Sequence, residues 1–265
     1  MKERITTALI LGIGALLLLL LSGLPLVMEL TAAALAVMGV FELLRTAGAE
    51  VSRAGVYISL GAAALITLLP IRYYSRRMLF LYPAALALFL VLMAAFRRGR
   101  RLPAAVVTVI GVVIALFARG VVELRGVGLR YLIAALAVCV LTDSAAFFVG
   151  RRLGRHKLAP RISPHKTVEG ALGGVLCSAA LVMLGARIFC RGNVNDPQLL
   201  FWMLSASVIA QFGDLSFSTV KRMAGVKDFG TLLPGHGGIL DRFDSCLFVL
   251  PYTVLFVTFC GRFLG

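Results

Sequence analysis

Apolar residues fall in long runs along this chain, and short polar connections separate the runs. Each run approaches the length of about 20 mostly apolar residues that an α-helix needs to cross the hydrocarbon core of a bilayer. The runs cover residues 5–22, 26–44, 54–71, 78–96, 102–118, 131–149, 168–186, 198–217 and 243–261. The pattern therefore predicts an all-α fold: a polytopic integral membrane helix bundle with about nine transmembrane helices.

Composition supports this interpretation. The chain has 265 residues, of which 60% are hydrophobic, and its mean hydropathy is +0.96. One soluble core cannot bury so much apolar material when it is arranged in long runs. The first run follows a short charged tail, but no small-residue cleavage site separates it from the second run, so we expect a retained helix rather than a signal peptide.

The net charge of +15 changes the expected partner. In a soluble protein it would suggest nucleic acid, but here the basic residues lie in the connections between runs, where anionic lipid head groups are found. We therefore expect membrane lipid and no nucleic acid as a partner. With nine spans, about two thirds of the 27 Lys and Arg residues fall on the same side of the membrane as the N-terminus. The positive-inside rule then predicts an N-terminus inside and, with nine spans, a C-terminus outside. We expect a multi-pass protein of the inner (cytoplasmic) membrane.

The acidic residues divide this single membrane unit into two regions. In residues 1–130, Glu29 and Glu42 are the only acids inside apolar runs, and we interpret this region as scaffold helices. In residues 131–265, half of the chain's 12 acids lie at the ends of runs or in the longest polar connections. These are Asp143, Glu169, Asp214, Asp228, Asp241 and Asp244. Carboxylates are costly in a membrane, so this region is the predicted catalytic region.

A polar stripe runs along the segment 198–217 and beyond it. At helical spacing its members share one face, and they are Ser207, Gln211, Asp214, Ser218 and Lys221. The stripe either packs against another polar helix or faces a functional site. We favour the second alternative, because an aspartate in a membrane needs a cation or a hydrogen-bond donor.

Two more aspartates follow, at the start of the last run. Asp241 and Asp244 are spaced i, i+3, so they share a helix face, and Asp214 can approach from the preceding helix. Three carboxylates near a membrane surface suit a hard cation such as Mg²⁺; without a cation they would have to hold protons. The flexible segment 234–238 precedes them and is either an anion-binding loop or a plain turn. Its His236 can orient a phosphate, transfer a proton or cap the turn.

The connection 150–167 is rich in basic residues and ends in the octet SPHKTVEG, which begins at Ser163. Ser163, Lys166 and Thr167 can donate hydrogen bonds to phosphate oxygens, and Glu169 falls in the expected first turn of the next run. The preceding arginines are equally well explained as a surface attracted to anionic lipid. Together with the aspartates, the octet predicts a cationic, metal-binding pocket for phosphates at the cytoplasmic membrane surface.

The longest motif supports a family resemblance. The segment 218–244, STVKRMAGVKDFGTLLPGHGGILDRFD, resembles the signature SxxKRxxxxKDxGxxLPGHGGxxDRxD of phosphatidate cytidylyltransferases (CDP-diacylglycerol synthases). The segments 143–170 and 211–218 also fit that family. Two positions depart from it, since the family commonly has tyrosine in place of Phe147 and lysine in place of His165.

The resemblance implies an enzyme of phospholipid biosynthesis. CTP and phosphatidic acid would give CDP-diacylglycerol and pyrophosphate, with Mg²⁺ as one cation or two, and a homodimer is compatible with the family. The implied metal ligands are Asp214, Asp241 and Asp244, and Lys221 and His236 join them as catalytic residues. The implied substrate-phosphate site comprises Ser163, Lys166, Thr167, Glu169, Ser218, Arg222, Lys227, Asp228, Gly237 and Asp143.

The sequence bears differently on three alternative functions. A cytidylyltransferase acting on an isoprenoid ether lipid would have a similar apolar groove, so the sequence leaves that substrate open. A CDP-alcohol phosphotransferase would carry the pattern D-G-x-x-A-R, which is absent. An ion-coupled transporter or a lipid-binding protein with a cation site would release no pyrophosphate from CTP.

Overall fold

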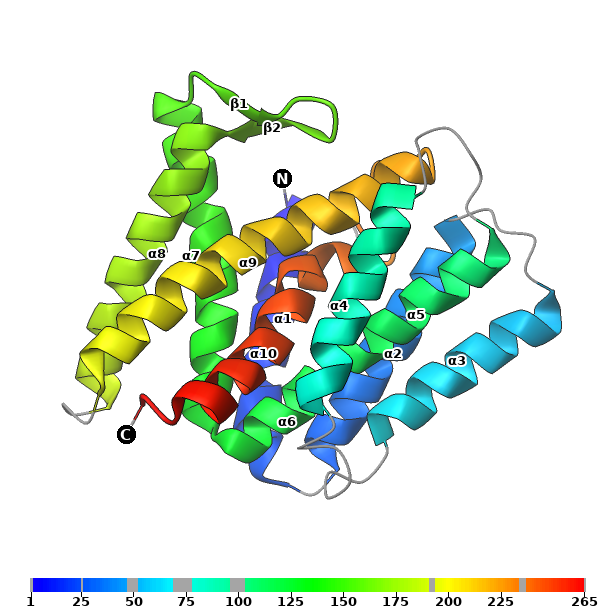
Figure 1. Ribbon diagram of the computed structural model, residues 1–265, viewed down its shortest axis with the longest axis horizontal. Helices are drawn as coiled ribbons and strands as arrows, with labels where there is room; N and C mark the ends of the chain where they lie inside the picture. Colours follow the sequence, from blue (N-terminus) through cyan, green and yellow to red (C-terminus); the bar gives the residue numbers. More distant parts are fainter. Residues whose placement is uncertain are drawn as a thin grey trace. The chain divides into compact units, whose positions relative to one another are not determined.

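Helices make up most of the computed structural model (Figure 1). It describes residues 2–24, 26–46, 52–68, 78–95, 103–190, 194–233 and 237–264. The first elements are α1 (Lys2–Leu20), the 3₁₀ turn η1 (Leu21–Gly23), α2 (Val27–Thr46), α3 (Arg53–Leu68), α4 (Met78–Ala95), α5 (Ala104–Ala118) and α6 (Gly120–Val127). They are followed by α7 (Leu129–Leu153), β1 (Lys157–Ala159), β2 (Ser163–Thr167), α8 (Val168–Phe189), α9 (Asp196–Met223) and α10 (Leu240–Cys260).

The apolar helices correspond to the predicted runs. Among the described residues, six helices are long and apolar enough to cross a membrane: Val27–Thr46, Val106–Val127, Leu129–Leu153, Val168–Phe189, Asp196–Met223 and Leu240–Cys260. Three shorter apolar helices are Gly12–Gly23, Gly55–Leu68 and Phe80–Met93. Each predicted run matches one of these segments, although run ends at 69–71, 96 and 102 lie outside the described residues. The prediction of an all-α, multi-pass membrane protein is confirmed.

Two elements differ from the prediction. The fifth run does not end at residue 118, because α6 continues it beyond Arg119. Arg119 is fully buried; its Nε lies 3.4 Å from Oε1 of Glu123, and its Nη1 donates to the carbonyl oxygen of Thr67 on α3. These partners explain how the helical segment tolerates charged residues. The second difference is the antiparallel hairpin of β1 and β2, in which Lys157 pairs with Thr167 and Ala159 with Ser163.

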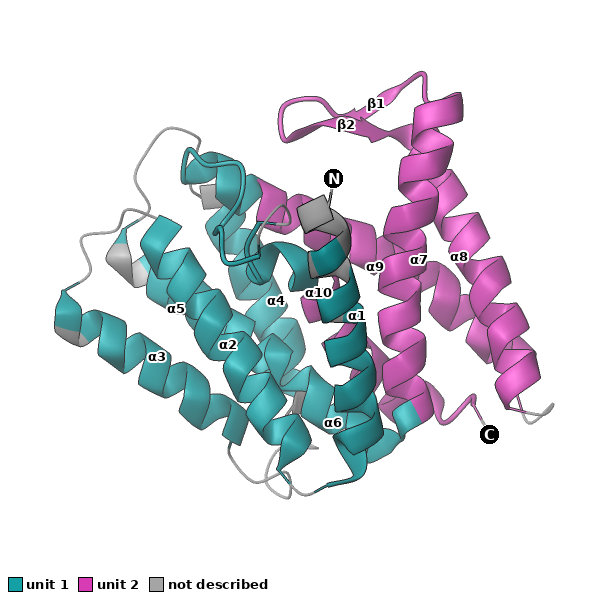
Figure 2. Cartoon of the chain, turned by 180° about the vertical axis from the view of Figure 1, so that it is seen from behind, with its two compact units in different colours: residues 1–129, 219–244 teal, residues 130–218, 245–265 magenta. Residues whose placement is uncertain are grey.

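The chain divides into two compact units, which Figure 2 shows in different colours. Unit 1 comprises Met1–Leu129 and Thr219–Asp244, and unit 2 comprises Arg130–Ser218 and Ser245–Gly265. The helices α9 and α10 therefore contribute residues to both units. The assignment of scaffold and catalytic roles to residues 1–130 and 131–265 stays a prediction.

Unit 1 is built around α2, which packs against α3, α5 and α6. Its buried face includes Ala32, Ala36 and Val40, which recur at helical spacing. A Cβ atom at Gly39 would lie 3.4 Å from side-chain atoms of Ile114 and Leu240, an ordinary van der Waals distance, so the helix start at Leu240 lies directly against α2 here. This packing places the beginning of α10 beside the middle of α2.

Unit 2 contains a close contact between α7 and α8 that depends on glycine. A Cβ atom at Gly170 would lie 2.7 Å from the carbonyl oxygen of Ala146, and one at Gly174 would lie 2.9 Å from the carbonyl oxygen of Thr142. No larger residue fits these two positions unless the backbones separate. The contact fixes the start of α8, where the hairpin joins it.

Candidate active site

The first half of the polar stripe on α9 packs against other helices of unit 2. The hydroxyls of Ser207 and Thr142 lie 2.8 Å apart, and Ser178 donates to Ser207 over 3.3 Å. The side-chain amide of Gln211 donates to the carbonyl oxygen of Ala171 over 3.0 Å. Here the alternative of packing against polar helices is confirmed, since this part of the stripe is satisfied within the protein.

Further along α9, Asp214 forms a cluster with the hairpin, which we call the hairpin cluster (Lys166, Asp214 and Ser218). Lys166 lies on β2 and its ammonium forms an ion pair with Oδ2 of Asp214. Ser218 donates from its hydroxyl to Oδ1 of the same carboxylate over 3.3 Å. The side chains of Lys166 and Asp214 are partly buried. Three residues predicted from the octet and the stripe are thus brought together.

The base of the hairpin is held by residues of the octet and of the loop before it. Glu169 lies in the first turn of α8, as predicted. Its carboxylate accepts from the backbone N–H groups of Arg155 and His156 over 3.0 and 3.2 Å and contacts Nδ1 of His156 at 2.6 Å. Glu169 therefore ties the loop that follows α7 to the start of α8, a role the sequence pattern did not indicate.

Thr167 caps α8. Its hydroxyl oxygen accepts from the backbone N–H of Gly170 over 3.1 Å, and the side chain is buried. Loss of such a cap typically costs about 1 kcal/mol. We expect Thr167→Val to lower the free energy of unfolding by about that amount, measured by denaturation in detergent. Thr167→Ser retains the hydroxyl and should stay within a few tenths of a kcal/mol of the parent; equal losses in both variants would exclude the cap as the cause.

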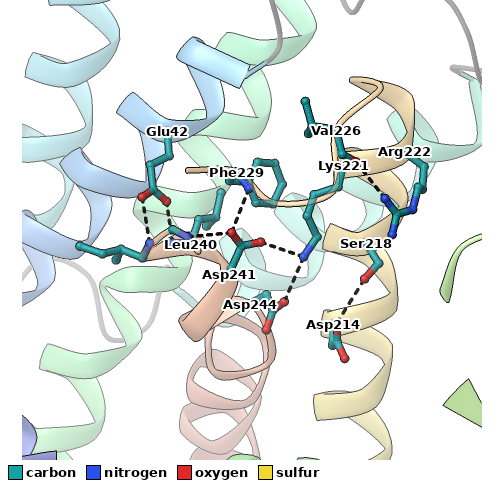
Figure 3. A network of polar contacts seen from close by, with 12 residues as sticks. Glu42, Asp214, Ser218, Lys221, Arg222, Val226, Phe229, Leu240, Asp241 and Asp244 are labelled. Carbon is teal, nitrogen blue, oxygen red and sulfur yellow. Dashed lines mark hydrogen bonds and ion pairs between the residues drawn. The ribbon is translucent and has the colours of Figure 1, made fainter. Parts of the chain in front are cut away.

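A second cluster lies in unit 1, and we call it the aspartate cluster (Lys221, Asp241 and Asp244; Figure 3). The ammonium of Lys221 donates to Oδ1 of Asp241 over 2.9 Å and lies 4.0 Å from Oδ2 of Asp244. The three side chains are at most 10% exposed. Two carboxylates thus share one ammonium in a buried place, where carboxylates need compensating positive charge or donors.

The loop before α10 folds around Asp241. Its Oδ2 accepts from the backbone N–H groups of Phe229 and Gly238, each over 2.9 Å. Gly237 has φ +82°, a left-handed conformation that favours glycine, and a Cβ atom there would lie 3.1 Å from Oδ2 of Asp241. The Cβ atom of Asp228 would lie 3.6 Å from the same Cβ atom placed at Gly237. The predicted residues Asp228 and Gly237 therefore lie next to Asp241.

The structure places the other predicted residues as follows. Arg222 donates to the carbonyl oxygen of Val226 over 3.0 Å, and Lys227 is exposed. Asp143 accepts from the hydroxyl of Ser245 over 3.4 Å in unit 2. Ser163 begins β2 opposite Ala159. His236 lies outside the described residues.

The predicted metal ligands fall in both units. Asp241 and Asp244 come together, whereas Asp214 belongs to the hairpin cluster of the other unit. In the part of the chain that the structure describes, no three His, Cys, Asp or Glu side chains form a metal-binding group. The joint site of three aspartates stays a prediction.

One residue of the site was placed in the scaffold by the sequence pattern. Glu42 on α2 accepts from the backbone N–H groups of Ile239 and Leu240 over 2.9 and 2.8 Å. Those two amides directly precede Asp241. The only sequence signal for this role was an acid within an otherwise apolar run.

Comparison with known proteins agrees with the motif. The model of the Cytidylyltransferase family matches residues 2–260. Similar proteins include the phosphatidate cytidylyltransferases of Staphylococcus epidermidis and Staphylococcus aureus, which are 52% and 50% identical over 129 residues. That segment is 49% of this chain and 49% of each relative, so the chain spans about half the length of the curated relatives it matches. Because the family model extends over nearly the whole chain, this protein belongs to the cytidylyltransferase family.

Proposed function

We propose that this protein is a nucleotidyltransferase that converts CTP and phosphatidic acid to CDP-diacylglycerol and pyrophosphate in phospholipid biosynthesis. Membership of the family and the names of the relatives support the reaction type. The observation that carries the proposal is the buried aspartate cluster, in which Lys221 lies between Asp241 and Asp244 on the signature segment. Such a cluster can bind cations and phosphate groups together.

The reaction balances as a single displacement at phosphorus. A phosphate oxygen of phosphatidic acid attacks the α-phosphorus of CTP, the bond from that phosphorus to the oxygen bridging to the β-phosphorus breaks, and pyrophosphate leaves with the bridging oxygen. A phosphate monoester has its second pKa near 6, so the attacking oxygen is mostly ionised near neutral pH and needs little help from a base. The main difficulty is to bring two anions together and align them.

The donor chemistry of the aspartate cluster fits Mg²⁺. This ion prefers oxygen ligands and is usually held by one or two carboxylates together with water and substrate phosphates. Asp241 and Asp244 would supply such carboxylates, and Asp214 is the third ligand in the proposal, with one cation or two. When bound, Mg²⁺ would neutralise triphosphate charge and stabilise the departing pyrophosphate.

The basic and hydroxyl side chains would bind the phosphates. In unit 1, Lys221 is already oriented by Asp241 and can donate to a phosphate oxygen, and Arg222 and Lys227 add positive charge nearby in the chain. In unit 2, Lys166 on β2 provides an ammonium, and the hydroxyl of Thr167 retains its own proton to donate. We assign both sets to phosphate binding.

The proposal includes the orientation and assembly predicted from the sequence. The distribution of Lys and Arg supports an N-terminus inside, a C-terminus outside and an active site on the cytoplasmic side. Labelling of single introduced cysteines near each terminus with a membrane-impermeant reagent tests the orientation. A homodimer also belongs to the proposal, and the mass of the detergent-solubilised protein tests it.

The activity is tested by measuring pyrophosphate release from purified protein in detergent with CTP, Mg²⁺ and phosphatidic acid. We expect release only when all three are present, because each supplies a part of the reaction described above. Release without lipid, or no release under any condition, would contradict the proposal. Faster release with an isoprenoid ether-lipid phosphate than with phosphatidic acid would retain the cytidylyl transfer but change the lipid substrate.

A further inference from the structure

Glu42 is a buried acid in an apolar helix. It lies on α2 and is 2% exposed, and its neighbours along the helix are mostly hydrophobic. A carboxylate in such surroundings is costly unless donors surround it, and acids within membrane segments commonly serve function. The identity of its donors therefore shows what the residue does.

The donors of Glu42 are backbone amides at the start of α10 (Figure 3). Oε1 accepts from Ile239 and Oε2 from Leu240, so the two oxygens bind two successive N–H groups. The first N–H groups of a helix have no partner within the helix, and a negative charge at this end is favourable. Glu42 therefore caps α10 from a helix nearly 200 residues away in sequence.

Glycines of the signature segment allow this contact. A Cβ atom at Gly230 would lie 2.7 Å from Oε1 of Glu42, and one at Gly238 would lie 2.5 Å from Oε2. Any side chain at either position would meet the carboxylate or displace it. The absence of a side chain at both positions thus lets the loop close around Glu42.

The same short segment binds Glu42 and Asp241. The N–H of Gly238 donates to Oδ2 of Asp241, and the next two N–H groups donate to Glu42. Asp241 in turn contacts Lys221. Three successive amides therefore connect the buried acid of α2 to the aspartate cluster through the first turn of α10.

We propose that Glu42 is a positioning residue for the reaction: it fixes the first turn of α10 so that Asp241 and Asp244 face Lys221. The inference rests on the proposed function of the aspartate cluster. Glu42 contacts none of the cluster's side chains in the hydrogen bonds shown, so it acts through the backbone it holds. The region predicted to be scaffold thereby contributes to the active site.

The test compares Glu42→Gln with Glu29→Gln. Glutamine has nearly the shape of glutamate, but its NH₂ group cannot accept a hydrogen bond, so one amide of α10 loses its partner. Glu29 lies in the first turn of the same helix, away from the residues that hold α10, and provides the matched control. Melting temperature and elution volume in detergent establish that both variants are folded.

Two readouts are needed. The first is hydrogen exchange of residues 237–244 without metal or substrate, where loss of a cap should raise the exchange rate roughly five- to tenfold in Glu42→Gln only. The second is kcat per folded molecule, which should fall about 10- to 100-fold in the same variant, as for other residues that orient metal ligands. A purely structural role would leave kcat per folded molecule unchanged.

The results of the two readouts separate failure of the inference from failure of the proposed function. The inference would be overturned by unchanged exchange at residues 237–244 in Glu42→Gln. It would also be overturned by faster exchange with a kcat equal to that of Glu29→Gln. In both cases an active parent protein would still support the proposed function. An inactive parent protein would overturn the proposed function, and with it the catalytic part of this inference. Faster exchange together with a lower kcat in Glu42→Gln alone is the expected result.

Discussion

Replacement of Asp244 by asparagine is expected to abolish detectable pyrophosphate release, with a loss of roughly 10²- to 10³-fold or more. The side chain is buried and shares Lys221 with Asp241 in the aspartate cluster. Asparagine keeps the shape but removes the negative charge, so the cluster would hold cations less well and Lys221 would lose part of its compensation. The measurement is pyrophosphate release with CTP, Mg²⁺ and phosphatidic acid.

The matched control is Asp196→Asn. Asp196 begins α9 and forms an exposed ion pair with Arg187, and exposed pairs contribute little to stability. We expect this variant to keep the activity of the parent protein. Normal turnover in a folded Asp244→Asn variant would remove Asp244 from the proposed metal ligands, whereas equal loss in both variants would indicate a general effect of the substitution.

Replacement of Lys166 by methionine is expected to lower kcat/KM for CTP by roughly ten- to hundredfold. A hydrogen bond to a charged group contributes about 1.5–3 kcal/mol, which corresponds to that range. The substitution removes the ammonium proposed to bind phosphate and leaves Asp214 without its ion-pair partner. Initial rates at varied CTP concentration measure the effect.

His165→Gln provides the control for Lys166. The two residues are adjacent on β2, and His165 is exposed, whereas Lys166 reaches Asp214. The control variant should retain the kcat/KM of the parent protein. If the Lys166→Met variant behaves like the control, the ion pair serves only to hold the hairpin, and Lys166 has no part in binding CTP.

The membrane fold could be predicted from the sequence because it depends on long apolar runs. The positions of the runs match those of the described apolar helices, and charged residues near the ends of some helices do not change this match. The helix α6 was not predicted because Glu123 and Arg125 interrupt the apolar pattern, and the contact of the buried Arg119 with Thr67 is a tertiary one that this pattern does not show. The hairpin was not predicted because its strands have only three and five residues and show no alternation of polar and apolar positions.

The site was predicted where it depends on spacing along a helix. Asp241 and Asp244, spaced i, i+3, lie on one face and approach Lys221, and Ser218 lies one turn from Asp214 and contacts it. The contact of Lys166 with Asp214 comes from the hairpin, and spacing along a helix does not predict it. The role of Glu42 could not be predicted in this way. Its partners are backbone amides, which every residue except proline possesses, so no side-chain pattern marks them.

The buried Arg119 bears on how the chain enters the membrane. An arginine at the centre of an inserting helix costs about 2.5–3.5 kcal/mol on the scale of cellular insertion. Glu123 lies one turn further along the same segment and forms an ion pair with Arg119, so an oppositely charged partner enters the membrane in the same helical segment. A second contact of Arg119, with the carbonyl oxygen of Thr67, comes from α3, which is synthesised earlier. The nascent chain thus already contains the acceptor when the arginine is synthesised, so α3 and α5 can associate before residues 131–265 have been made.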